Sequence, residues 1–115
     1  VPLLLGTDTV GLVAPGFSTH QELMLMVQSG LTPFEALQTA TVNPARWAGK
    51  DGAEGIIAEG AKADLVLLSQ NPLDDITATR LVEGVITNGQ WLANDRLEAM
   101  LESCKQPNNP EQRSR

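Results

Sequence analysis

Asp8 is the residue whose position most directly suggests chemistry. It follows a continuous apolar run, Val1 to Leu5, which ends at Gly6-Thr7. The run predicts a buried strand of the parallel type, apolar on both faces. Because ligands and catalytic groups gather at the carboxyl ends of such strands, Asp8 is a candidate catalytic or metal-binding carboxylate. On position alone, a turn or capping role for an Asp after Gly-Thr is the commoner outcome.

The other chemically versatile side chains are single copies. The chain has one histidine, His20, and one cysteine, Cys104. A zinc site usually needs three or four protein ligands, so this chain cannot supply a histidine-rich site from its own residues. His20 is a candidate substrate-binding residue. The alternative, favoured slightly for a histidine with no visible partner, is a solvent-facing residue in a first helical turn. Cys104 is expected to be a reduced cysteine on the surface or in a helix.

Length and composition limit the function classes. The chain has 115 residues, a net charge of -6 and 42% hydrophobic residues, which fits one packed domain. A complete (β/α)8 barrel is excluded, because it needs roughly 200 residues or more. The acidic balance argues against nucleic acid and anionic membranes as partners, and no apolar run approaches a transmembrane span.

The start of the chain bears on its location. It opens on Val1 without a basic region, so it does not resemble a signal peptide. A start without Met suggests a processed or excised piece, and a targeting signal could lie upstream. We expect a cytoplasmic protein.

Helices are predicted in the first half. Thr19 to Glu22 fits a capping box before a helix that ends at Ser29-Gly30. Thr32-Pro33 with Glu35 repeats the pattern, and Asn43-Pro44 predicts a new cap and a short helix to Ala48. The stretch 10–18 between strand and first helix is expected to be a loop, with Thr9, Val10, Gly16 and Phe17 as candidate pocket-lining residues.

After Lys50 the pattern changes to short strands. Strands are predicted at 63–68, 82–87 and 90–92, the last two joined at Asn88-Gly89, and a helix at 95–104. Arg46 could pair with a carboxylate across helices, and Asp64 is expected to form a turn. Asp74 and Asp75 are expected to lie on the solvated surface. Trp47 and Trp91 are expected to pack in a core or between domains. The predicted units are 1–49, 50–93, 94–104 and a disordered tail at 105–115.

Three stretches together resemble the C-terminal third of the metal-dependent amidohydrolase superfamily. They are Leu5-Gly6-Thr7-Asp8; the helical stretch from Glu22-Leu23 through Gly30-Leu31-Thr32-Pro33-Phe34-Glu35-Ala36-Leu37 to Ala40-Thr41-Val42-Asn43-Pro44-Ala45; and Gly55 to Val66 with Asn71-Pro72-Leu73 and Val85-Ile86-Thr87-Asn88-Gly89. The similarity spans about residues 3 to 92 and is nearest the branch of imidazolonepropionases and Xaa-Pro dipeptidase-like enzymes.

The resemblance implies an α/β fold. Residues 1–49 would form the C-terminal piece of a (β/α)8 barrel, namely its last strand and the helices that follow. Residues 50–93 would form part of a small β-sandwich. It implies one or two divalent metals, usually zinc, in the complete enzyme. Asp8 matches the aspartate of the eighth strand, which contacts the metal and shuttles a proton between water and leaving group. The substrate would be a small amide, cyclic amide or dipeptide, cleaved at a C–N bond.

The departure from the family is equally clear. The family's other metal ligands, a His-x-His pair, often a carboxylated lysine and two further histidines, are absent. We therefore expect the isolated chain to be inactive and to bind no zinc tightly. The alternative is a free-standing, non-catalytic module that self-associates or binds a partner, because a barrel strand without neighbours leaves unpaired edges and an apolar face.

Overall fold

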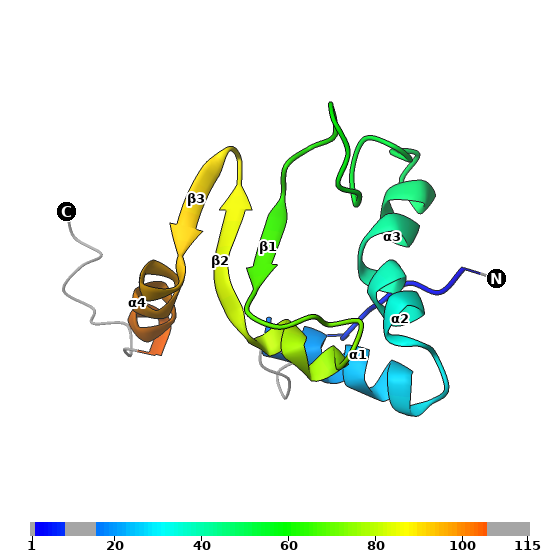
Figure 1. Cartoon of the computed structure of the whole chain (residues 1–115), viewed down its shortest axis with the longest axis horizontal. Helices are drawn as coiled ribbons and strands as arrows, with labels where there is room; N and C mark the ends of the chain where they lie inside the picture. Colours follow the sequence, from blue (N-terminus) through cyan, green and yellow to red (C-terminus); the bar gives the residue numbers. More distant parts are fainter. Residues whose placement is uncertain (1, 9–15, 106–115) are drawn as a thin grey trace.

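A computed structural model of the chain describes residues 2–8 and 16–105 (Figure 1). Most of the predicted loop at 10–18, and the tail beyond Lys105, lie outside the described residues. In chain order the elements are α1 (Phe17–Gln28), α2 (Pro33–Ala40), α3 (Val42–Trp47), β1 (Leu65–Leu68), the 3₁₀ helix η1 (Ile76–Arg80), β2 (Val82–Thr87), β3 (Gln90–Ala93) and α4 (Asn94–Lys105). Within the described ranges, no helix is long and apolar enough to cross a membrane.

The N-terminal apolar run is not a strand in this structure. Residues 2–8 belong to no helix or strand, and the segment runs along α2 and α3 (Figure 1). The backbone N–H of Leu5 donates to the carbonyl of Thr39 at 2.9 Å, and the Asn43 side chain donates to the carbonyl of Leu3 at 2.9 Å. The prediction of a strand here is wrong for this chain, because a strand needs a neighbouring strand to share its hydrogen bonds. The run is held by helices instead.

Helix α1 begins earlier than predicted. The N-cap is Gly16, which has φ 82 and makes no side-chain capping hydrogen bond. Thr19 is therefore the third residue of the helix, and the capping box predicted for Thr19 and Glu22 is wrong. The C-terminal prediction is confirmed: Ser29 is the C-cap, and Gly30 follows in the left-handed region with φ 112.

Helix α2 starts as its sequence predicts. The hydroxyl of Thr32 accepts the backbone N–H of Glu35 at 3.2 Å, and the Glu35 carboxylate accepts the backbone N–H of Thr32 at 2.8 Å. The Thr32 backbone N–H and, after it, the Thr32 hydroxyl hydrogen-bond to the Glu35 carboxylate and lower its pKa. With Pro33 at the first helical position, this capping box fixes the start of α2.

Helix α3 starts at a different residue from the one predicted. It begins at Val42 with Thr41 as N-cap, so Asn43 lies inside the helix and does not cap it. The side chain of Asn43 is used for the contact with the carbonyl of Leu3 described above. Tertiary hydrogen bonding to the N-terminal segment has thus replaced the local capping role that Asn-Pro predicts.

The three strands form one antiparallel sheet in the order β1-β2-β3 (Figure 1). The predicted hairpin between β2 and β3 is confirmed, with Asn88 at φ 49 and Gly89 at φ 73, the positive angles that a type I′ turn requires. Gly84 of β2 lies beneath Trp91: an added Cβ would lie 2.1 Å from the indole ring. Helix α4 packs against β2 and β3.

The core joins the helices to η1, which the sequence analysis did not predict. Leu23 of α1, Ala36 of α2 and Ile76 of η1 form its buried cluster. Asp75 caps η1 by accepting the backbone N–H of Thr77 at 2.9 Å and its hydroxyl at 2.7 Å, and these hydrogen bonds lower the pKa of Asp75. Asp75 is exposed as predicted, but it also has a structural role in starting η1.

Candidate functional site

Asp8 is an exposed carboxylate with an unusual backbone. Its φ is 43, in the left-handed region that few residues other than glycine adopt, although Asp tolerates it better than most. The preceding residues are fixed at Leu3 and Leu5 by hydrogen bonds to α3 and α2. Such backbone conformations persist where the surrounding structure imposes them, and they cluster at functional sites. The structure therefore presents Asp8 at the surface directly after an anchored segment.

His20 is held by a residue from another part of the chain. It is the fourth residue of α1 and is half-buried, and its Nδ1 lies 3.1 Å from the hydroxyl of Thr79 in η1. Burial of the ring, and after it the nearby Arg80 guanidinium, lower the pKa of His20 below its usual 6.5. Both causes favour the neutral form of the imidazole. The interpretation of His20 as a solvent-facing side chain without a partner is wrong.

The structure joins His20 to η1 and does not join it to Asp8. Within residues 2–8 and 16–105, no hydrogen bond or ion pair connects Asp8 to His20. The segment between them, 9–15, lies outside the described residues, and with it the predicted pocket residues Thr9 and Val10. The other two, Gly16 and Phe17, are exposed at the start of α1. Whether His20 contacts a substrate stays a prediction.

Thr79 and Arg80 are the polar neighbours that sequence reasoning missed. They lie 59 and 60 positions after His20, so no local spacing connects them to it. A 3₁₀ helix also lacks the 3.6-residue apolar period by which longer helices are recognised. Only packing of η1 on α1 brings these residues to the histidine.

The donor chemistry of the described residues does not make a metal centre. Across 2–8 and 16–105, no group of three or more His, Cys, Asp or Glu side chains could hold a metal ion. Asp8 offers one carboxylate, whereas a zinc site takes three or four protein ligands. Asp8 can thus contribute a ligand to a metal site but cannot form one with its described neighbours.

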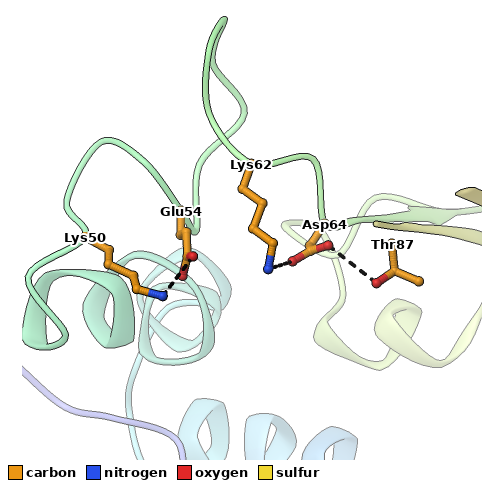
Figure 2. A network of polar contacts seen from close by, with 5 residues as sticks. All are labelled: Lys50, Glu54, Lys62, Asp64 and Thr87. Carbon is orange, nitrogen blue, oxygen red and sulfur yellow. Dashed lines mark hydrogen bonds and ion pairs between the residues drawn. The ribbon is translucent and has the colours of Figure 1, made fainter. Parts of the chain in front are cut away.

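Two groups of polar contacts lie in the loop after α3 and where this loop meets the sheet (Figure 2). Lys50 pairs with Glu54 at 3.0 Å, and Lys62 pairs with Asp64 at 2.7 Å; Asp64 also accepts from the Thr87 hydroxyl at 3.5 Å. The hydrogen bond between Lys62 and Asp64 lowers the pKa of Asp64 and raises that of Lys62. With its carboxylate paired beside β1, Asp64 has a structural role.

The remaining polar and aromatic predictions have mixed outcomes. Arg46 pairs with Asp51, in the loop that follows α3, at 3.1 Å, so the expected pairing across helices is wrong. Trp47 is 81% exposed, so it does not pack in the core of this chain. Cys104 is a free, exposed cysteine in α4, as predicted.

An apolar groove lies on the sheet. It has a volume of about 360 Å³ and is lined mainly by aliphatic and aromatic side chains of Ile56, Ile57, Leu65, Leu67, Ile86 and Trp91. Ile57 at its rim is 90% exposed. Neither Asp8 nor His20 lines this groove, so it is separate from the candidate polar site.

Comparison with known proteins decides the family. The profile described as the amidohydrolase family matches residues 1–92. The chain belongs to the amidohydrolase family. Among individual relatives of this amidohydrolase chain, ochratoxinase from Aspergillus niger is 42% identical over 78 residues, which are 66% of this chain and 15% of that enzyme. Imidazolonepropionase from Vibrio campbellii is 34% identical over 106 residues, covering 84% of this chain and 24% of that enzyme.

A solved structure supports the same assignment. A Xaa-Pro dipeptidase with bound methionine in its active site matches with a TM-score of 0.71 at 31% identity, over 79% of this chain and 22% of that one. The predicted branch of the family, with imidazolonepropionases and Xaa-Pro dipeptidases, is therefore confirmed. This amidohydrolase chain spans less than a quarter of the length of these relatives.

Proposed function

We propose that this chain is the C-terminal part of a metal-dependent hydrolase that cleaves C–N bonds in a small amide, cyclic amide or dipeptide. The observation that carries the proposal is the position of Asp8: the carboxylate follows an anchored apolar segment, has a left-handed backbone, and lies within the family match. The names of the relatives support this substrate range, since imidazolonepropionase and Xaa-Pro dipeptidase are among them.

The proposal includes the place of the chain in a larger fold. Residues 1–49 would be the last strand and following helices of a (β/α)8 barrel, and 50–93 the C-terminal strands of a small β-sandwich. Residues 2–5 are apolar, and among the described residues no strand pairs with residues 2–8. They would join a ladder when neighbouring barrel strands are supplied.

Asp8 is assigned the role of proton carrier. A carboxylate at the carboxyl end of a strand can take a proton from an attacking water and pass it to the leaving nitrogen. Because the described residues contain no group of three or more His, Cys, Asp or Glu side chains that could hold a metal, we assign the remaining ligands of the divalent metal, usually zinc in this family, to parts of the protein not contained in this chain. When bound, such a metal makes water acidic enough to supply hydroxide near neutral pH.

Hydrolysis by the longer protein tests the role of Asp8. Asp8→Asn keeps the size of the side chain and removes its proton-accepting charge, so we expect kcat to fall by roughly 10²- to 10⁴-fold. Asp51→Asn makes the same replacement at an exposed carboxylate paired with Arg46 and should leave kcat unchanged. An unaltered kcat in Asp8→Asn would overturn the assignment.

The isolated 115-residue chain provides the second test. We expect it to hydrolyse neither a prolyl dipeptide nor a cyclic amide, and to retain less than stoichiometric zinc after dialysis. Elemental analysis and hydrolysis assays measure both quantities. Stoichiometric, tightly held zinc would contradict the proposal that the metal ligands lie elsewhere.

A second candidate function is a non-catalytic module that self-associates. The apolar groove favours it, with Ile57, Val66 and Leu67 more than half exposed. Within the described residues, β1 also pairs on one side only, with β2, so its other edge is open. Open edges and exposed apolar surface promote pairing between copies.

A further inference from the structure

His20 and Thr79 form a contact that neither the family match nor the proposed chemistry assigns. They come from α1 and η1, two elements that pack on each other, and Nδ1 of His20 lies 3.1 Å from Oγ1 of Thr79. Thr79 is buried, with 8% of its surface exposed. In such a setting the hydroxyl and the ring nitrogen have few other partners, and the direction of the hydrogen bond between them matters.

The direction follows from the hydrogen bonds of the hydroxyl. A threonine hydroxyl has one proton to donate and lone pairs to accept with. Oγ1 of Thr79 donates to the carbonyl of Ile76 at 2.9 Å, so its proton is committed there. With the hydroxyl proton used in that bond, the 3.1 Å contact is formed when Nδ1–H of His20 donates and Oγ1 accepts, which is the tautomer inferred next.

We infer that Thr79 is a positioning residue that holds His20 in the Nδ1–H tautomer, which leaves the lone pair of Nε2 as a hydrogen-bond acceptor. The tautomer of a neutral histidine is set by the bond that the other ring nitrogen makes. His20 therefore differs from a histidine in water, where the Nε2–H form is preferred.

The charge of the His20 ring also determines whether Nε2 can donate a hydrogen bond. Burial and the neighbouring Arg80 favour the neutral form of His20, as described above. A neutral ring with its proton on Nδ1 offers no donor at Nε2. Resting on the proposed function, a substrate group that meets Nε2 would therefore be a donor, such as an amide N–H or an ammonium, and not a carboxylate.

Nitrogen NMR of the isolated chain tests the inference directly. The chain has a single histidine, so the two imidazole ¹⁵N signals need no assignment among residues. At pH 8 we expect the wild-type spectrum to show a protonated Nδ1 and an unprotonated Nε2. A wild-type spectrum with the proton on Nε2 would overturn the inference, whatever the variants do.

Variants of Thr79 separate positioning from folding. Thr79→Val keeps the shape of the side chain and removes the hydroxyl, so the ring should shift toward the Nε2–H tautomer. Thr79→Ser retains the hydroxyl and should restore the wild-type spectrum. If Thr79→Val leaves the tautomer unchanged while amide spectra show a folded chain, Thr79 does not position the ring.

If Thr79→Val fails to fold, the wild-type spectrum still decides the tautomer, and a third variant separates the Thr79 contact from the neighbouring charge. Arg80→Gln removes the neighbouring positive charge and keeps the Thr79 contact, so the tautomer should stay Nδ1–H. A change of tautomer in this variant would contradict the role of Thr79. These spectra need neither substrate nor metal, so their outcome is independent of whether the proposed hydrolysis is correct.

Discussion

At the scale of single residues, Asp8 and His20 differ in how the rest of the chain holds them. Asp8 is exposed, and its position depends on the anchoring of Leu3 and Leu5. His20 is half-buried and hydrogen-bonded to Thr79, a residue from a different element. The side chain of Asp8 is accessible to a ligand in solvent, whereas the side chain of His20 is part of the packed structure, and its environment depends on the folded contact of α1 with η1.

The pKa of His20 predicts a pH dependence of stability. Because the pKa is lowered in the folded chain, the unfolded chain binds the proton more readily below its own value of 6.5. The contribution of His20 to the free energy of unfolding should be fully present above pH 6.5 and should be lost as the pH falls through the pKa of the folded chain. We expect the melting temperature, followed by circular dichroism, to decrease from about pH 7.5 to about pH 5.

His20→Gln provides the control for this effect. It removes the titrating ring, so the decrease between these two pH values should disappear. The pKa values of Glu35, Asp64 and Asp75 are also lowered, but from 4.5, 3.8 and 3.8, so their contributions are lost only at lower pH. The same slope in wild type and His20→Gln would show that another group is responsible.

At the scale of residues, the sequence carries only local signals, and the site roles of Asp8 and His20 stay predictions. Asp8 and His20 could be selected as candidates because their types are reactive and their positions follow predicted elements. Thr79 could not be selected, because its importance comes from a contact across 59 positions that only the packing of η1 on α1 creates.

At the scale of elements, the start of α2 shows the strongest local encoding. The capping box of Thr32 and Glu35 satisfies two backbone N–H groups that the helix leaves unpaired. We expect Thr32→Ala to lower the free energy of unfolding by about 1 kcal/mol. Thr32→Ser keeps the accepting oxygen and should retain most of the stability. Urea unfolding measures both, and equal losses in the two variants would argue against capping as the cause.

Gly55 and Gly52 provide a matched pair for the loop after α3. Both have positive φ, 74 and 79, but an added Cβ at Gly55 would lie 2.4 Å from the Thr41 carbonyl oxygen, whereas at Gly52 nothing lies within 4 Å. Gly52→Ala should cost about 1 kcal/mol from backbone conformation alone. Gly55→Ala should cost more, because backbone atoms must also move.

The comparison isolates the close approach of this loop to Thr41. Thermal unfolding of the two alanine variants gives the difference in stability between them. If both variants lose the same stability, the loop does not need to lie against Thr41, and the contact at Gly55 is not important for folding.

The predicted helix and strand ends agree with the structure where one short motif determines them. The caps of α2 and the Asn88-Gly89 hairpin lie within two to four residues and were predicted. The same capping pattern at Thr19 failed, because the N-cap of α1 is Gly16, three positions earlier, and the helix begins at Phe17. The N-terminal strand failed because, among the described residues, no strand pairs with residues 2–8.

At the scale of the whole molecule, the open edge of β1 and the apolar groove predict association. We expect the 115-residue chain to elute in light-scattering chromatography with a mass above its monomer value of 12.3 kDa. Val66→Lys places a charge on an exposed position of the edge strand and should shift the mass toward the monomer.

A second lysine variant tests whether the effect belongs to β1. Leu101→Lys also removes an exposed apolar side chain, but on α4, and should leave the mass unchanged. A wild-type chain that is monomeric at about 100 μM would count against self-association, and an equal effect of both variants would point to general hydrophobic attraction.

The positions of the two tryptophans have an optical consequence. Trp47 lies almost fully in solvent on α3, whereas Trp91 lies against Gly84 on the sheet. Because Trp91 is 51% exposed and Trp47 is 81% exposed, iodide in the buffer should quench the emission of Trp47 more strongly than that of Trp91. A Trp47→Phe chain would fluoresce only from Trp91, so the unfolding of the sheet could be followed by intrinsic emission, without an attached dye.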